Sequence, residues 1–206
     1  MYIDKSIVTF RAGEPPRQDV RVSNTSDDVI YVQVEAFMVE NPGQENEERI
    51  PVTNPQEQKL VATPNKLVIP AGGHKLVRIL NLDQRSASER IYRINVTPIV
   101  APLAEETSQL KIVVAYQILA IVQPADPHSK LEVARTGNRI SFTNQGNTNI
   151  LLGDGQQCST DDPGQCQELT SHRLYAGSSW ELELPYDAPV NYSVRSYDGI
   201  KNEVFP

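Results

Sequence analysis

Short β-rich segments separated by turn dipeptides recur along the whole chain, and helix signals are almost absent. Segments such as "RISFTNQ" and "WELELP" are rich in β-branched and aromatic residues, which strands favour. Pairs such as Pro42-Gly43 and Asp198-Gly199 lie between them and are strong turn formers. The stretch "YVQVEAF" alternates, and its expected half-buried face consists of Tyr31, Val32, Val34, Ala36 and Phe37. Many short strands at this spacing predict an all-β protein built from β-sandwiches.

A domain boundary is expected near "QPADPHSK", where two prolines, the end of a long apolar run and a shift in charge coincide. Residues 1–124 carry a net charge of −2, from 13 Lys+Arg and 15 Asp+Glu. Residues 125–206 carry −5, from 6 and 11. We therefore expect one sandwich of seven to eight strands in residues 1–124 and a second of six or seven strands in residues 125–206, each the size of an immunoglobulin-like domain.

Charge and motifs argue against several classes of function. Neither half of the chain has a basic excess, so no nucleic-acid partner is expected. His74, His128 and His172 lie apart and lack metal-ligand spacing, and the chain contains no nucleophile elbow and no P-loop. We therefore predict no catalytic residue, no metal, no cofactor and no enzymatic activity.

The first residues and the two cysteines bear on the cellular compartment. Residues 2–10 lack a long apolar core behind a basic start, so the protein is either cytosolic or has lost a leader, with Met1 added. No segment is long enough for membrane insertion. Cys158 and Cys166 flank an Asp-Asp-Pro-Gly turn, which suits a disulfide closing a hairpin, whereas zinc would need further ligands. Two free cytosolic thiols are the alternative, and we favour an oxidising compartment.

The run Leu110–Val122 is apolar at both even and odd positions, and Lys111 is its single charge. As a strand it would be about 43 Å long, against a typical length of about 17–20 Å. One interpretation is an ordinary long strand that leads into the linker. The other is an exposed strand that pairs with the open sheet of a partner lacking a strand of its own. The free protein could also cover such a strand by self-association.

Several motifs follow one another in a characteristic order. The segment "LVATPNKLVIPAGGHKLVRIL" combines Thr-Pro, a strand, Pro-x-Gly and a strand containing an arginine, and "ERIYRINVTPIVAP" and "LKIVVAYQILAIVQP" come after it. In this order and spacing the chain resembles the periplasmic pilus-assembly chaperones of the chaperone–usher pathway. The resemblance covers nearly the full length and is strongest over residues 20–124. The Tyr92-Arg93 pair and the cysteines of the second half resemble the non-classical branches, the alternative and archaic systems.

The resemblance implies two immunoglobulin-like domains in an L-shaped arrangement, and a periplasmic protein whose signal peptide is absent from this sequence. It also implies donor-strand complementation, in which residues 108–122 lend alternating side chains to an incomplete fimbrial (pilin) subunit. The side chains expected to do so are Leu110, Ile112, Val114, Tyr116 and Ile118. An outer-membrane usher would then receive the complex and contact the first domain near Thr63-Pro64.

The pilin's terminal carboxylate needs a basic partner, and the usual basic pair of this family cannot be carried over. Leu119 occupies one of its two positions, and the other falls near Ile7. Arg93 is the first candidate for a carboxylate anchor, followed by Arg78 and Lys5, because an arginine can hold a carboxylate with two hydrogen bonds. A solvated surface charge is the alternative for each.

The leading interpretation is therefore a non-enzymatic chaperone for pilin subunits. The alternative is a secreted or cell-surface adhesion module of two immunoglobulin-like domains, in which the run Leu110–Val122 would be buried internally.

Overall fold

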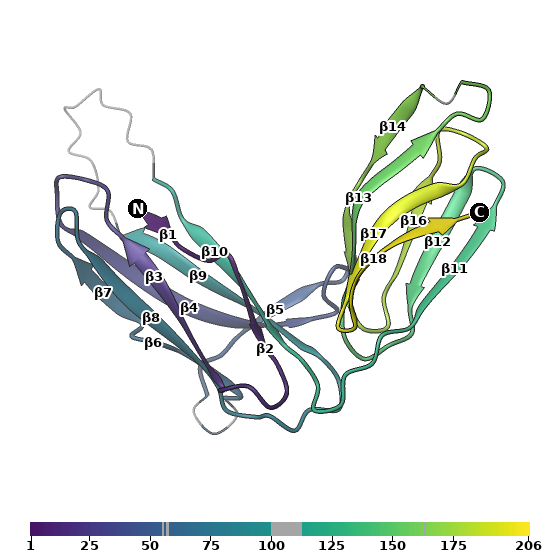
Figure 1. The fold of residues 1–206 in the computed structure, drawn as a ribbon. Coiled ribbons are helices and arrows are strands. Elements are labelled where there is room, and N and C mark those ends of the chain that lie inside the picture. Colours follow the sequence, from purple (N-terminus) through teal and green to yellow (C-terminus); the bar gives the residue numbers. More distant parts are fainter. Residues whose placement is uncertain (55, 57, 100–112, 163) are drawn as a thin grey trace. The chain divides into compact units, whose positions relative to one another are not determined.

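The computed structural model describes residues 1–54, 56, 58–99, 113–162 and 164–206. Every regular element in this part of the chain is a β-strand (Figure 1), which confirms the all-β prediction. The strands form two compact units. The first unit contains Met1–Glu40, Glu48–Arg85 and Arg90–Val122, and the second contains Asn41–Glu47, Ser86–Glu89 and Gln123–Pro206. The chain thus divides after Val122, two residues before the expected boundary. No helix in the described part is long and apolar enough to span a membrane.

The first unit is a sandwich of two sheets. The four-stranded sheet has the order β1-β3-β8-β6, and the six-stranded sheet has the order β2-β10-β9-β4-β5, with β7 pairing β4. The strands of the first sheet are β1 (Tyr2–Ile3), β3 (Arg17–Ser23), β8 (His74–Asn81) and β6 (Leu60–Thr63). Those of the second are β2 (Ile7–Phe10), β10 (Tyr116–Val122), β9 (Arg90–Ile99), β4 (Ile30–Glu40), β5 (Glu48–Pro51) and β7 (Lys66–Ile69).

The core of the first unit follows largely from alternation along the middle of its long strands. Even-numbered positions in the middle of β4 and β9, such as Val32 and Ile94, are buried between the sheets. Because successive side chains of a strand point to opposite faces, the odd positions lie on the other face of the six-stranded sheet. Tyr31 and Phe37 lie on that other face. The half-buried face expected from the sequence therefore combined residues from both faces of β4.

The apolar run ends in β10, which begins at Tyr116 and not at Leu110. Ile118, Ala120 and Val122 are buried in the core of the first unit. Leu119 and Ile121 have opposite parity and are also buried. The apolar character of both faces is therefore explained for the last five residues of the run. Residues 100–112 lie outside the described part of the chain.

The second unit is also a sandwich, with sheets of the order β11-β12-β16 and β14-β13-β17-β18, and with β15 pairing β13. Its core centres on Phe142, whose ring makes edge contacts with Tyr192 and Phe205 at 5.6 and 5.3 Å and stacks on Trp180 at 5.7 Å. The strands are β11 (Leu131–Thr136), β12 (Arg139–Asn144), β13 (Ile150–Cys158), β14 (Cys166–Leu169), β15 (His172–Leu174), β16 (Ser179–Glu183), β17 (Val190–Ser196) and β18 (Gly199–Phe205).

Candidate functional site

Strand β10 has one edge that is paired along its whole length and one that is paired only in part. β9 pairs with it in antiparallel fashion from Tyr116 to Val122. β2 pairs with the other edge in parallel, and only from Leu119 onward. Over Tyr116–Ile118 no strand of the described residues lies on that second edge. The first three residues of β10 therefore offer a sheet edge to which a further strand can be added.

The five side chains expected to enter a partner differ in their accessibility. Leu110 and Ile112 lie outside the described residues. Val114 precedes β10 and is 50% exposed. Tyr116 packs against the edge of the core, and its hydroxyl donates a hydrogen bond to the carbonyl of Met1 at 3.1 Å.

Ile118 differs from these residues because it is fully buried in the core of the first unit. It lies where β10 enters the sandwich, and even positions there point between the two sheets. Its side chain therefore contributes to this protein's own fold and is not accessible to a partner.

An exposed apolar row crosses three strands on the outer face of the six-stranded sheet. Val68 of β7 lies opposite Tyr31 of β4, and Tyr31 lies opposite Ile99 of β9. These side chains are 53, 52 and 50% exposed. Sequence reasoning missed this apolar row because Tyr31 was grouped with the buried face, although strict alternation with Val32 would have separated them. A row of this kind on a sheet surface is suited to contact with another protein.

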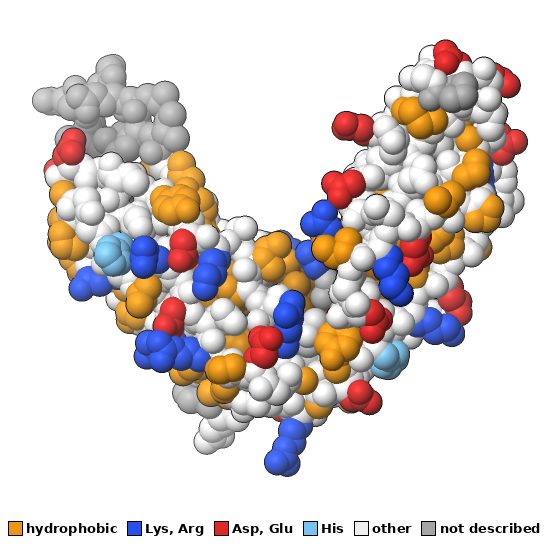
Figure 2. Space-filling view, viewed as in Figure 1, with side chains coloured by type: hydrophobic (Ala, Val, Ile, Leu, Met, Phe, Trp, Pro, Cys, Tyr) orange, Lys and Arg blue, Asp and Glu red, His pale blue; other side chains and the backbone are white. Residues whose placement is uncertain are grey.

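Two of the three basic candidates contact one residue of the four-stranded sheet, Asp19, Arg78 through its carboxylate and Lys5 through its backbone carbonyl. Arg78 Nε is 2.9 Å from Oδ1 of Asp19, and Lys5 Nζ donates to the backbone carbonyl of Asp19 at 3.0 Å. Hydrogen bonds from Arg17 and then Arg78 hold the pKa of the Asp19 carboxyl well below its usual range. Figure 2 shows Lys and Arg side chains interspersed with Asp and Glu over the visible face. Arg78 therefore already has an anionic partner.

Arg93 lies in the other sheet, on the central strand β9. It stands opposite Phe37 of β4 and Leu119 of β10, on the same face as the apolar row. Its Nε atom is buried and has no hydrogen-bond partner among the described residues. Arg78 already pairs with the Asp19 carboxylate, so Arg93 remains the first candidate for the carboxylate anchor.

Thr63 and Pro64 connect β6 to β7 through a cis peptide bond. They line a cavity of about 600 Å³ that also touches β4 and β5. The cavity lies where β4 changes its partner from β7 to β5. At this point the amide of Val34 donates to the carbonyl of Asn65 at 2.8 Å. The segment expected to face an usher is therefore an accessible surface feature of the first unit.

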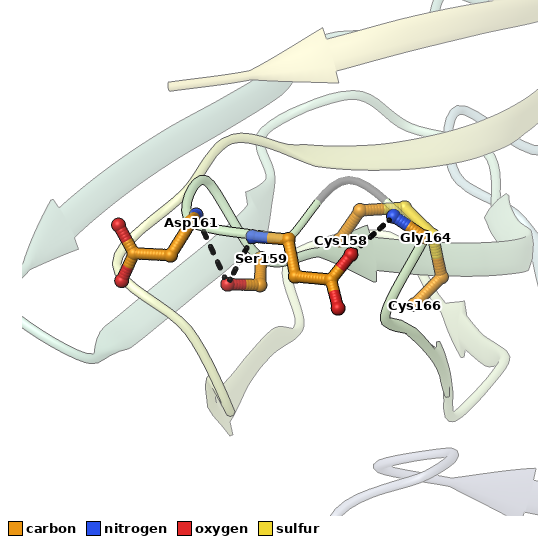
Figure 3. The surroundings of a disulfide bond; sticks show 6 residues. Cys158, Ser159, Asp161, Gly164 and Cys166 are labelled. Atoms are coloured by element: carbon orange, nitrogen blue, oxygen red, sulfur yellow. Dashed lines mark hydrogen bonds between the residues drawn. A yellow bond between two sulfur atoms is a disulfide. The ribbon is translucent and has the colours of Figure 1, made fainter.

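The disulfide predicted from the turn is present in the second unit. Cys158 ends β13 and Cys166 begins β14, and the two residues lie directly opposite in the antiparallel ladder. The connecting turn is held by its own side chains, as Figure 3 shows: the amide of Asp161 donates to Ser159 Oγ at 3.2 Å, and the amide of Gly164 to Asp162 Oδ1 at 3.1 Å. Aspartate and serine form such local turns readily, so the hairpin closes where the cysteine spacing predicts.

These features are suited to binding other proteins by strand pairing. The first unit offers an open strand edge, exposed apolar side chains and an arginine with an unused donor. The described residues contain no group of three or more His, Cys, Asp or Glu side chains placed to hold a metal ion. The fold and the exposed surface together indicate an immunoglobulin-like protein that binds another polypeptide.

Comparison with known proteins identifies the family. Residues 1–128 match the family described as pili and flagellar-assembly chaperone, PapD N-terminal domain. Because the match covers more than half of the chain, the protein belongs to this family of pilus-assembly chaperones. The family is a class of chaperones and not of enzymes, and the resemblance found in the sequence is confirmed. Membership of a chaperone family favours the chaperone interpretation over the alternative of a secreted or cell-surface adhesion module.

Individual relatives, both named as fimbrial proteins, agree with this assignment. A CS1 fimbrial protein of Escherichia coli is 27% identical over 191 residues, which cover 87% of this chain and 79% of that protein. A CFA/I fimbrial protein of Escherichia coli is 22% identical over 194 residues, covering 89% and 81%.

Solved structures show that the fold extends over both units. The class 5 fimbriae chaperone CfaA has a TM-score of 0.72 at 20% identity and covers 100% of this chain and 98% of its own. The SafB chaperone, solved with the SafA pilin of Salmonella enterica, gives 0.70 at 16% identity, covering 99% and 93%. The CsuC–CsuE pre-assembly complex from the archaic Csu pili of Acinetobacter baumannii gives 0.64 at 15% identity, covering 99% and 96%. The chain therefore has two immunoglobulin-like domains.

Proposed function

We propose that this chaperone binds fimbrial subunits in the periplasm by donor-strand complementation and delivers them to an outer-membrane usher. The observation that carries the proposal is the open edge of β10 over Tyr116–Ile118. Just before it, Val113 and Val114 are 42 and 50% exposed. An incomplete pilin that pairs with this edge would gain the strand that it lacks.

The apolar side chains before β10 supply the binding free energy in this proposal. Leu110, Ile112 and Val114 share one parity, so an extended backbone would present all three to the same side. Burial of each large side chain contributes about 1.5–3 kcal/mol. Tyr116 marks the end of the binding strand, because its ring already packs on the core. Ile118 is left out because it is buried.

We propose that Arg93 binds the terminal carboxylate of the pilin. Arg78 and Lys5 both contact Asp19 in the other sheet, whereas Arg93 has a buried Nε without a partner among the described residues. An arginine–carboxylate pair forms two parallel hydrogen bonds. We therefore expect Arg93→Gln, which removes the charge and keeps much of the side chain, to weaken pilin binding while leaving the fold intact.

The usher is expected to contact Thr63 and Pro64 and the apolar row beside them. β7 begins two residues after Pro64, and it carries Val68 of the apolar row. An exposed apolar surface of this kind is the usual sign of a protein contact. The disulfide of the second unit supports an oxidising compartment, which is consistent with a periplasmic location.

Capture of the pilin tests the proposal. A tagged protein expressed in the periplasm of the source organism is purified, and the eluate is identified by mass spectrometry. The wild type should retain a stoichiometric pilin, and Val114→Glu should lose it, since a charge cannot enter an apolar groove without a large cost. The matched control is Val29→Glu, at a valine that is 47% exposed and lies outside β10. Retention of the pilin in the Val114→Glu eluate would show that the strand assignment is wrong.

A further inference from the structure

The second unit ends in an edge strand whose outer side carries no strand of the described residues. β18 (Gly199–Phe205) is the last strand of its sheet and pairs with β17 from Ser196 opposite Gly199 to Val190 opposite Phe205 (Figure 1). Ile200 and Val204 in this strand are 67 and 65% exposed, the highest values among the large apolar side chains described. An open edge with exposed apolar side chains is a template for pairing with another strand.

The sequence of β18 is complementary to itself in the antiparallel direction. When two copies of the strand pair around Asn202, Ile200 of each copy lies opposite Val204 of the other. Lys201 of each copy then lies opposite Glu203 of the other. Twofold symmetry makes each of these pairs occur twice, as in any interface that uses the same surface on both partners. Opposite charges and apolar pairs placed directly across two strands are both favourable.

The two charges also select this register over its neighbours. A shift of two residues in one direction places Lys201 opposite Lys201, and a shift of two in the other places Glu203 opposite Glu203. A shift of one residue leaves Lys201 opposite Asn202 or Val204 and moves the apolar pairs apart. A lysine on an edge strand normally discourages pairing with foreign strands. Here a second copy of the same strand supplies its counterion.

We propose that β18 is a self-association surface, at which two copies of this chaperone pair edge to edge through their second units. The contact would join the two β14-β13-β17-β18 sheets into one continuous sheet and cover Ile200 and Val204 of both copies. It lies in a different unit from β10, so it goes beyond the binding of pilins and does not depend on it. One strand per copy is a small interface, and the dimer is therefore weak and concentration-dependent.

Charge reversal at the two paired positions tests the proposal by sedimentation equilibrium, with concentrations reaching the millimolar level. Lys201→Glu and Glu203→Lys each place like charges opposite one another at both symmetric positions. Each single variant should weaken dimerisation at least about tenfold. The double variant Lys201→Glu/Glu203→Lys should dimerise like the wild type. An equimolar mixture of the two single variants should form a mixed dimer, because every facing pair then joins opposite charges.

Two further variants separate this contact from other effects of charge. Lys75→Glu makes the same change of net charge at an exposed position of β8, and it should dimerise like the wild type. Val114→Glu should also dimerise normally, which distinguishes β18 from self-association through the strand that precedes β10. The proposal is overturned if the wild type stays monomeric at millimolar concentration, if the single variants associate unchanged, or if the double variant does not recover. The Lys201→Glu variant should capture pilin normally. Pilin binding at β10 and self-association at β18 are therefore tested independently.

Discussion

Alanine substitutions at Ile118 and Val114 should distinguish the protein's own core from its binding strand, although only three residues lie between them. Ile118 is fully buried among core side chains. Its truncation removes three carbon groups, worth about 2.4 kcal/mol at about 0.8 kcal/mol for each. The cavity left behind raises the expected loss of stability to about 3–4 kcal/mol. Val114 is 50% exposed, so its truncation should cost less than about 0.5 kcal/mol.

Equilibrium unfolding in urea, followed by far-ultraviolet circular dichroism, measures both effects. For an m-value of about 1.5 kcal/mol/M, Ile118→Ala should lower the unfolding midpoint of the first unit by about 2 M, whereas Val114→Ala should leave it nearly unchanged. Pilin capture should show the reverse order: Val114→Ala should bind less pilin than the wild type, and the folded Ile118→Ala protein should bind it normally. Equal losses of stability in the two variants would refute the division of the strand at Tyr116.

Two further predictions concern the second unit, and Trp180, the only tryptophan of the chain, reports on both. Replacing Cys158 and Cys166 together by alanine should cost about 2–3 kcal/mol of stability from the opened short loop; an unchanged unfolding midpoint in Trp180 fluorescence would contradict this. His172 stacks on Trp180 at 4.6 Å, and burial lowers the pKa of its imidazole below 6.5. The unfolded chain then binds this proton more readily, so stability should fall as pH drops through about 6.5. His172→Gln should reduce this loss, and an identical pH profile in the variant would exclude His172 as its source.

Local features of the sequence were sufficient to predict several parts of the fold. Alternating β-branched residues and turn dipeptides predicted the strands, because periodicity and turn chemistry are properties of neighbouring residues. The spacing of Cys158 and Cys166 around a turn predicted their disulfide for the same reason. The order of motifs from residue 20 to residue 124 predicted the family.

Features that depend on distant parts of the chain could not be predicted. The sequence alone does not show that the side chain of Ile118 packs between the two sheets, so Ile118 was grouped with the side chains expected to enter a partner. The sequence also does not show which groups surround Arg78 and Arg93. They differ because Asp19 lies beside Arg78 in the folded sheet, whereas Arg93 lies between Phe37 and Leu119.

The parallel pairing of β2 with β10 joins two strands that lie far apart in the sequence of the first unit. Ile7 aligns with Leu119 and Phe10 with Val122, so a strand near the start of the unit pairs with its last strand. Contacts of such long sequence separation form slowly, because a large loop must close first. A chain interrupted before Val122 cannot make the full contact between β2 and β10. The sheet that carries the open edge is therefore complete only when both ends of the first unit have been joined.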